Sequence, residues 1–217
     1  MSEASQRDSK SSLSQSVGSF AELVAAGTPT PGGGSVAAYC GVLAASLGQM
    51  VCSITIGKPK YAGVEPRLKE IAAELERTSA RLRELIAEDA ASFEAVLNAY
   101  RLPKDTEAQK EERTVAIQKA LQCAIAVPLE TAERSLEVLT LLGELADIGT
   151  PNALSDVAVG AQLAQVAVKG ASYNVGANLG SLKDSESATA TRARMDAVIE
   201  QSKTIAERVD EKMKTQR

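Results

Sequence analysis

Apolar residues recur at helical spacing along most of the chain, and no segment shows the two-residue alternation of a strand. The clearest stripe follows Pro66, a residue that the first turn of a helix tolerates. The spacing predicts one long helix from Pro66 to about Tyr100. At about 100° per residue, one face of this helix collects Ile71, Leu75, Leu82, Leu85, Ile86, Phe93, Val96 and Tyr100.

Capping sequences and prolines mark the other elements. Ser19–Glu22 and Thr106–Gln109 both have the form of a capping box, which satisfies the first free N–H groups of a helix. They predict a short helix ending at Gly27 and a long one ending near 127, where Pro128 kinks or ends it. Further helices are expected up to 148, after the Gly149–Pro151 turn, and from about 185. The predicted fold class is therefore all-α, a helical bundle with long up-and-down helices.

The segment between Gly27 and Gly57 carries no charged residue. A membrane-spanning helix has to be considered, because about 20 apolar residues are enough to cross a bilayer. The segment is rich in Ala, Gly and Ser, includes Gln49, and has no matching second span elsewhere. Small residues let helix backbones approach closely. We therefore interpret it as a tightly packed, buried helix and expect no membrane association.

Composition constrains the core and the partners. Hydrophobic residues make up 44% of the 217 but aromatic residues only 3%, so Ala, Val, Leu and Ile must build the core. The net charge is −4 with both signs mixed along the chain, which argues against nucleic acid as a partner. The length suits one domain, residues 18–217, preceded by a polar, Ser-rich tail, residues 1–17, that we expect to be disordered.

The chain has no histidine, which removes the commonest metal ligand and the usual general base near neutral pH. Cys40, Cys52 and Cys123 are far apart in the sequence and lie in apolar surroundings, so we expect buried thiols in a reducing compartment. The polar start of the chain does not resemble a signal peptide. These features favour a cytoplasmic protein.

Two acidic residues stand where charges are unusual. Asp89 lies in the middle of the apolar stripe, so burial should raise its pKa and suit it to proton transfer. The alternative is that the stripe ends locally and Asp89 meets water or an arginine. Asp156 stands alone in a long uncharged stretch, where a continuous helix would place it on one face with Asn174 and Asn178. That face fits either a polar pocket or hydrogen-bonded helix packing.

A glycine-rich loop precedes the uncharged helix. Its residues are Pro31, Gly32, Gly33, Gly34 and Ser35. Free N–H groups and the helix dipole at such a position attract an anion, although a simple tight turn explains the glycines equally well. The loop lacks the Lys-Ser/Thr ending of a nucleotide-binding P-loop, so we do not expect an NTPase.

The other end of the uncharged helix is followed by Lys58, Lys60 and Tyr61. One of the lysines could polarise a charged centre, and the tyrosine hydroxyl could relay a proton. Surface lysines are usually only solvated, which is the simpler explanation.

Taken together, these segments resemble one family. The matching stretches follow in order: Thr30–Ser35, Ile56–Tyr61, Asp89 with Phe93, Leu102–Lys104, Val127–Leu129, Pro151–Asp156, and Asn174–Val175 with Asn178. In this ordered set the chain is similar to the formiminotetrahydrofolate cyclodeaminase and methenyltetrahydrofolate cyclohydrolase family, from about Phe20 to Asp184. One position departs from the family pattern, because Thr150 stands where Asn is expected after Gly149.

The resemblance implies an all-helical fold, a homodimer, and a folate site in a groove near the dimer interface. It also implies catalysis with no metal and no cofactor, on a tetrahydrofolate derivative as substrate. Asp89 is then the candidate general base, with Lys58, Lys60 and Tyr61 as its catalytic partners. The substrate-binding candidates are the glycine-rich loop residues named above, together with Asn152, Ser155, Asp156, Asn174 and Asn178.

The expected reaction is the hydrolysis of 5,10-methenyltetrahydrofolate to 10-formyltetrahydrofolate. The carbon that water attacks is already part of a cationic amidinium group, so a desolvated carboxylate can replace histidine as the base. One alternative is the ammonia-releasing ring closure of formiminotetrahydrofolate, which acts on the same carbon. The other alternative is a helical protein that binds folate without turnover.

Overall fold

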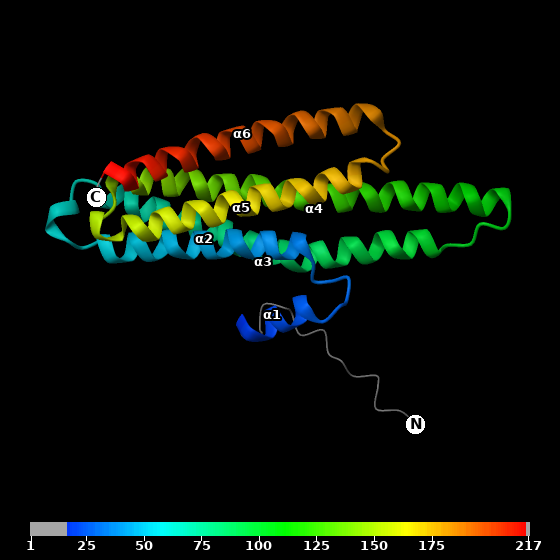
Figure 1. The fold of residues 1–217 in the computed structure, drawn as a ribbon, viewed down its shortest axis with the longest axis horizontal. Coiled ribbons are helices and arrows are strands. Elements are labelled where there is room, and N and C mark those ends of the chain that lie inside the picture. The colour runs from blue at the N-terminus through cyan, green and yellow to red at the C-terminus, as the bar shows by residue number, and fades with distance from the viewer. Residues whose placement is uncertain (1–16, 216–217) are drawn as a thin grey trace, which may run out of the picture.

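The structure, a computed structural model, describes residues 17–215, and these residues form six helices and no strand (Figure 1). The helices are α1 (Val17–Ala25), α2 (Gly33–Thr55), α3 (Glu65–Arg101), α4 (Glu107–Ile148), α5 (Leu154–Leu179) and α6 (Ser185–Thr215). Two short 3-10 turns, η2 (Pro59–Tyr61) and η3 (Pro151–Ala153), precede α3 and α5. The predicted all-α bundle is confirmed. The predicted tail lies outside the described residues, apart from Val17.

Helices α2, α3, α4 and α5 pack together as the body of the bundle, and α6 lies along α4 and α5 (Figure 1). Successive long helices run in opposite directions because short turns connect them. The core is aliphatic, as the composition predicts. Its large, fully buried side chains include Leu68, Ile71, Leu75, Leu82, Leu85, Leu139, Leu142 and Leu145.

Small residues let α2 approach its neighbours closely. A Cβ atom added at Gly48 would lie 2.7 Å from Cδ1 of Leu75, and Ala44 and Ala45 are fully buried. Helix α2 is long and apolar enough to cross a membrane, but half of its most apolar window is buried inside the bundle. This packing agrees with the interpretation of the uncharged segment as a tightly packed helix.

Of the two alternatives predicted at Pro128, a kink or an end of the helix, the end is wrong, because α4 continues through that residue as a single helix. Proline has no N–H, so the carbonyl four residues earlier, that of Ala124, loses its helical partner. The side-chain amide of Asn178 on α5 takes this place, with its Nδ2 atom 2.9 Å from the Ala124 oxygen. A hydrogen bond from another helix thus satisfies the carbonyl and allows the helix to continue.

The two predicted capping boxes have different outcomes. Helix α1 begins before Ser19, so Ser19 and Glu22 lie inside the helix and do not cap it. The box at Thr106 and Gln109 is present: the Thr106 side chain accepts a hydrogen bond from the Gln109 backbone, and the Gln109 side chain accepts one from the Thr106 backbone.

The three thiols are unbonded, and Cys52 alone among them is fully buried. Cys40 is partly buried, and the prediction of a buried thiol is wrong for Cys123, which is exposed. Cys123 lines an open groove between α3 and α4, where small neighbours such as Ala99 and Ala120 leave it uncovered.

Two similar ion-pair clusters fix α3 against α4. Arg67 makes a two-pronged contact with Glu144, with both N–O distances 2.7 Å, and also contacts Glu70 and Glu74 on its own helix. Arg81 repeats this pattern fourteen residues later. Its two-pronged contact is with Glu130, and its partners on the same helix are Glu84 and Glu88. Fourteen residues are close to four helical turns, so both clusters lie on one face of α3.

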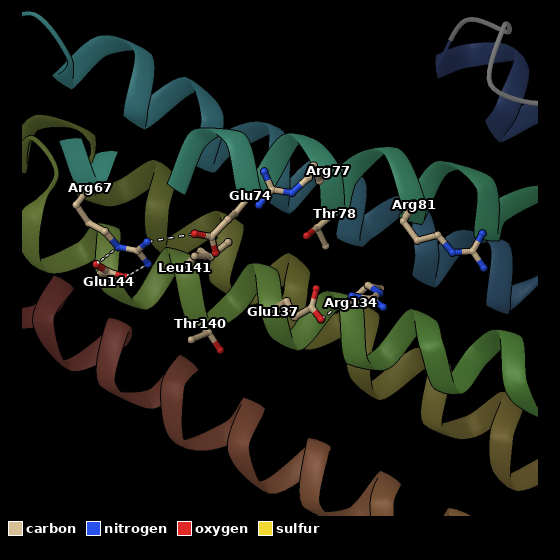
Figure 2. Close-up of a pocket in the computed structure, with 10 residues that line it drawn as sticks. All are labelled: Arg67, Glu74, Arg77, Thr78, Arg81, Arg134, Glu137, Thr140, Leu141 and Glu144. Carbon is tan, nitrogen blue, oxygen red and sulfur yellow. Dashed lines mark hydrogen bonds and ion pairs between the residues drawn. The ribbon is translucent and has the colours of Figure 1, made fainter. Parts of the chain in front are cut away.

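A groove of about 510 Å³ lies between these clusters on the α3–α4 face (Figure 2). Arg67 and Glu144 point toward each other across it in Figure 2. Three of its four arginines, Arg67, Arg81 and Arg134, are already paired with carboxylates. The groove therefore lies between two helices that ion pairs hold together. Carboxylates of the same chain neutralise most of the positive charge of its arginines.

Candidate active site

A cavity of about 170 Å³ lies where α2 begins beside the middle of α3. Asp89 reaches this cavity from α3, and Gly33 and Gly34 reach it from the first turn of α2. The complete lining is Pro29, Thr30, Gly32, Gly33, Gly34, Asp89, Ser92, Phe93, Val96, Ala124, Asn174 and Asn178. Four segments that are far apart in the sequence therefore meet at one polar site.

The apolar stripe of α3 is buried in the core only as far as Asp89. Residues before this point, such as Leu82 and Ile86, are buried, whereas Phe93 and Tyr100 are 40% and 44% exposed. The prediction of a buried stripe is thus wrong for Phe93 and Tyr100, because α2, which covers the earlier part of α3, starts beside Asp89. Asp89 stands at the boundary between the core and the cavity.

Gly34 makes room for the Asp89 carboxylate. A Cβ atom at position 34 would lie 2.1 Å from Asp89 Oδ1, so no other residue fits there without displacing the acid. The carboxylate consequently lies against the first turn of α2, where free N–H groups and the helix dipole attract negative charge. The anion at this helix start is Asp89 itself, and the glycine-rich loop shapes the cavity around it.

Ser35 contacts Asp89 in a way that suits two protonation states. Its hydroxyl oxygen lies 2.9 Å from Asp89 Oδ2 and 3.1 Å from the Ile86 carbonyl oxygen. A hydroxyl has one hydrogen to donate and can also accept a hydrogen bond. It can donate to an ionised Asp89. It can equally accept a hydrogen bond from a protonated Asp89 while donating to the Ile86 carbonyl.

Burial raises the pKa of Asp89 above the ordinary value of an aspartate, because the charged form loses hydration. Hydrogen bonds from the Ser35 side chain and the Ser35 backbone N–H oppose this effect by favouring the charged form. A carboxyl group with a raised pKa and a hydrogen-bond partner for each protonation state is suited to accept and return a proton.

Asn174 and Asn178 approach the cavity from the last turns of α5. Asn174 donates to the Gly170 carbonyl at 3.0 Å, and its amide lies beside Gly33. The Asn178 amide donates to the Ala124 and Asn174 carbonyls at 2.9 and 3.0 Å. The Asn178 nitrogen is therefore occupied by the fold, which leaves its oxygen as the atom available to a ligand.

Six other predicted site residues lie at the opposite end of the bundle. Lys58, Lys60 and Tyr61 follow the end of α2, and Asn152, Ser155 and Asp156 stand at the start of α5. Helix α2 is about 33 Å long at about 1.5 Å per residue, so these residues are far from Asp89 within one chain. The expectation that the lysine–tyrosine segment lies beside Asp89 is not met inside a single subunit.

The six residues of this distant group are all at least partly exposed to solvent in the single chain. Lys58, Lys60, Asn152 and Ser155 are exposed, whereas Tyr61 and Asp156 are partly covered. Thr150, which departs from the family pattern, is buried nearby, and its N–H donates to Thr55 Oγ1 at 3.2 Å. This contact joins the end of α2 to the turn before α5.

Sequence patterns did not single out several residues that line the Asp89 cavity. Ser92 lies one helical turn from Asp89 and donates to its backbone carbonyl at 2.9 Å, and the helical spacing is the signal that points to it. Ala124 has no comparable signal, because its role depends on the loss of a hydrogen bond at Pro128.

Among the described residues, no group of His, Cys, Asp and Glu has a geometry suited to a metal ion.

Comparison with known proteins identifies relatives over nearly the whole chain. A methenyltetrahydrofolate cyclohydrolase from Methylorubrum extorquens is 35% identical over 201 residues, covering 93% of this chain and 97% of that protein. The formimidoyltransferase-cyclodeaminase of Rattus norvegicus is 36% identical over 197 residues, covering 91% of this chain. This chain spans only 36% of the rat protein.

A solved structure has the same fold. The formiminotetrahydrofolate cyclodeaminase of Thermotoga maritima superposes with a TM-score of 0.84 and 28% identity, covering 93% of this chain and 96% of that one. The sequence model of the family described as formiminotransferase-cyclodeaminase matches residues 16–197. The chain belongs to the formiminotransferase-cyclodeaminase family.

Proposed function

We propose that this protein is a methenyltetrahydrofolate cyclohydrolase that converts 5,10-methenyltetrahydrofolate to 10-formyltetrahydrofolate. The observation that carries the proposal is Asp89, a partly buried carboxyl group held at the edge of a polar cavity by Ser35. The full-length match to a protein named as this enzyme supports the same reaction, because the two chains cover each other almost completely.

The reaction needs one group to accept a proton and then return it. Ionised Asp89 takes a proton from water as the water oxygen bonds to the amidinium carbon, which gives a neutral tetrahedral intermediate. The bond from that carbon to N5 then breaks, N5 receives the proton from Asp89, and the remaining hydroxyl loses its proton to become the formyl carbonyl. One proton is released to solvent overall, and Asp89 is ionised again.

Ser35 stabilises Asp89 through this cycle. It donates its hydrogen to the ionised carboxylate before water attacks, and rotates the same hydrogen to the Ile86 carbonyl when Asp89 is protonated. Because the donor and both acceptors are already in place, little reorganisation accompanies the proton transfer. The groups in this proton transfer all belong to the chain itself, and we propose that the protein uses no metal and no cofactor in this reaction.

We further propose that the active protein is a homodimer whose two copies pack through α2 and α5. These adjacent helices carry large apolar side chains that are exposed in the single chain. They are Leu43, Met50 and Ile54 of α2 and Val159, Val166 and Tyr173 of α5, all at least 38% exposed. Large apolar side chains exposed on two adjacent helices are typical of a subunit interface.

Two-fold symmetry would unite the separated site residues. An isologous contact whose two-fold axis is perpendicular to α2 and passes near its middle places the start of this helix in one copy beside its end in the other. The Asp89 cavity of one copy then faces Lys58, Lys60 and Tyr61 of the second copy. The same cavity also faces Asn152, Ser155 and Asp156 of the second copy, because these residues lie at the same end of the bundle as the lysines. In this arrangement a lysine stabilises the negative charge that develops on the hydroxyl oxygen as it loses its proton, and the polar α5 residues hold the pterin.

The proposal is tested by mixing the purified protein with 5,10-methenyltetrahydrofolate and following the loss of its near-ultraviolet absorbance. A parallel assay measures ammonia release from formiminotetrahydrofolate. Absorbance loss well above the uncatalysed rate supports the cyclohydrolase, whereas ammonia release alone supports the cyclodeaminase. Binding of the folate with neither reaction supports a non-catalytic folate-binding protein and overturns the enzyme proposal.

The cyclodeaminase remains the second candidate for a specific reason: the solved structure that shares this fold is itself named a formiminotetrahydrofolate cyclodeaminase. Both reactions pass through a tetrahedral centre at the same carbon, so one cavity can serve either. For both, we propose a cytoplasmic protein whose partners are its folate substrate and a second copy of itself, without nucleic acid or membrane.

A further inference from the structure

A second cavity, of about 230 Å³, adjoins the Asp89 cavity along α3. Pro29, Thr30 and Phe93 line both cavities, so the two are neighbours that share one side of the loop preceding α2 and one residue of α3. The second cavity continues past Phe93 to Arg101 at the end of α3. Its remaining lining residues are Glu94, Leu97 and Asn98.

Arg101 is the positive charge at the far end of the second cavity. Its contact within the described part of the chain is with a neutral acceptor, Asn98 Oδ1, at 3.3 Å, and it forms no ion pair there. This differs from Arg67 and Arg81 on the same helix, which carboxylates hold in two-pronged contacts. A guanidinium group with free N–H donors binds a planar carboxylate well.

The positions of these groups fit an elongated ligand. Twelve residues separate Asp89 from Arg101, about 18 Å along the helix axis at about 1.5 Å per residue. The long Arg101 side chain points back toward the helix N-terminus, which brings its guanidinium closer to Asp89. Phe93 lies between them, 40% exposed, with part of its ring free to stack on an aromatic group.

We propose that the second cavity binds the glutamyl end of the folate substrate, with Arg101 contacting a glutamyl carboxylate and Phe93 contacting the benzoyl ring. This inference rests on the proposed function, since it takes the reacting carbon to lie at Asp89. Glu94 also lines the cavity and opposes an anion, so Arg101 must face the carboxylate while Glu94 faces the amide N–H or solvent. Arg101 sets affinity for the tail and takes no part in proton transfer.

The test compares two substrates in the full-length protein. One is 5,10-methenyltetrahydrofolate and the other is the corresponding methenyl derivative of tetrahydropteroate, which lacks the glutamate. In Arg101→Gln we expect KM for the folate to rise about tenfold, with kcat within about twofold of the original protein. KM for the pteroate compound stays unchanged. Arg101→Lys, which keeps the charge but loses the planar fork, gives an intermediate KM.

Arg77→Gln is the matched control, because Arg77 is exposed on the same helix, has no ion pair in the described part of the chain and lies far from both cavities. It leaves both KM values unchanged. An equal change for the two substrates in Arg101→Gln, or no change in either, overturns the inference while leaving the cyclohydrolase intact. If the unmodified protein turns over neither compound, the proposed function fails and this inference fails with it.

Discussion

At the scale of single residues, the proposed mechanism assigns proton transfer to one aspartate, in a chain that has no histidine. Asp89 is partly removed from water, which raises its pKa, and Ser35 provides a hydrogen bond for each of its protonation states. Gly34 is equally necessary, because any larger residue would occupy the position of the carboxylate.

Replacing Asp89 by Asn should abolish turnover, because an amide cannot accept the proton from water. In the proposed mechanism activity requires ionised Asp89, so we expect the rate to rise with pH and the midpoint of the rise to lie above the ordinary pKa of an aspartate. A pH profile of kcat/KM measures this midpoint. Full activity in Asp89→Asn would remove this residue from the mechanism.

The same pKa shift has a consequence for stability. A carboxyl group whose pKa is raised by folding binds its proton more tightly in the folded state, so stability falls as pH rises through the interval between the unfolded and folded pKa values. Above that interval Asp89→Asn should therefore be at least as stable as the unmodified protein. Urea unfolding at neutral pH checks this point, and it separates loss of chemistry from loss of fold.

The role of Ser35 can be measured as a shift of the pH profile. Ser35→Ala removes the side-chain donor that favours ionised Asp89, so the pKa of Asp89 should rise further and the midpoint should move to higher pH. Ser92→Ala is the control, because Ser92 lines the same cavity but bonds the backbone of Asp89. A midpoint unchanged in Ser35→Ala, or moved equally in both variants, would contradict the assigned role.

At the scale of the elements, the continuity of α4 depends on a residue of α5. Pro128 frees the Ala124 carbonyl inside the bundle, and the Asn178 amide binds it. The same contact directs Asn178 toward the cavity, so one hydrogen bond serves both the helix and the site.

A double-mutant cycle tests this dependence. Asn178→Ala should lower the free energy of unfolding by about 1–3 kcal/mol, because a buried carbonyl loses its partner. In the Pro128→Ala background the restored N–H can serve the Ala124 carbonyl, so the cost of Asn178→Ala should fall by about 1 kcal/mol. Urea unfolding of the four proteins measures both values. Equal costs in the two backgrounds would show that the two residues are not coupled.

At the scale of the whole molecule, the predicted site residues are divided between the two ends of the bundle. Asp89, the glycine-rich loop, Asn174 and Asn178 meet at one end, and the lysine–tyrosine segment and the start of α5 lie at the other. The proposed dimer makes a complete site from the two halves.

Mixing two inactive variants tests this arrangement. When Asp89→Asn is co-expressed in equal amounts with a Lys58→Ala, Lys60→Ala variant, half of the dimers contain both chains, and each of these has one site without a substitution. We expect about a quarter of the original activity per subunit if the site is shared between copies. The separate variants should each be nearly inactive. Activity of the mixture equal to the mean of the two variants would place the site within one chain.

The sequence by itself determined the class of fold and singled out the acid that we propose as the general base. Helical periodicity, a capping box at Thr106 and a core limited to small and aliphatic residues are local properties, so they are readable along the chain. Asp89 is recognisable for the same reason, since a charge inside a periodic apolar stripe is visible without knowledge of its neighbours.

Only the tertiary structure decided which candidates meet. The helix passes Pro128 because Asn178, fifty residues later, reaches its free carbonyl, and no local pattern at Pro128 records that. The two ends of α2 carry equally suggestive motifs, yet a rigid helix holds them about 33 Å apart. Spacing along a helix determines which residues share a face, whereas distance in space depends on where each helix starts, stops and packs.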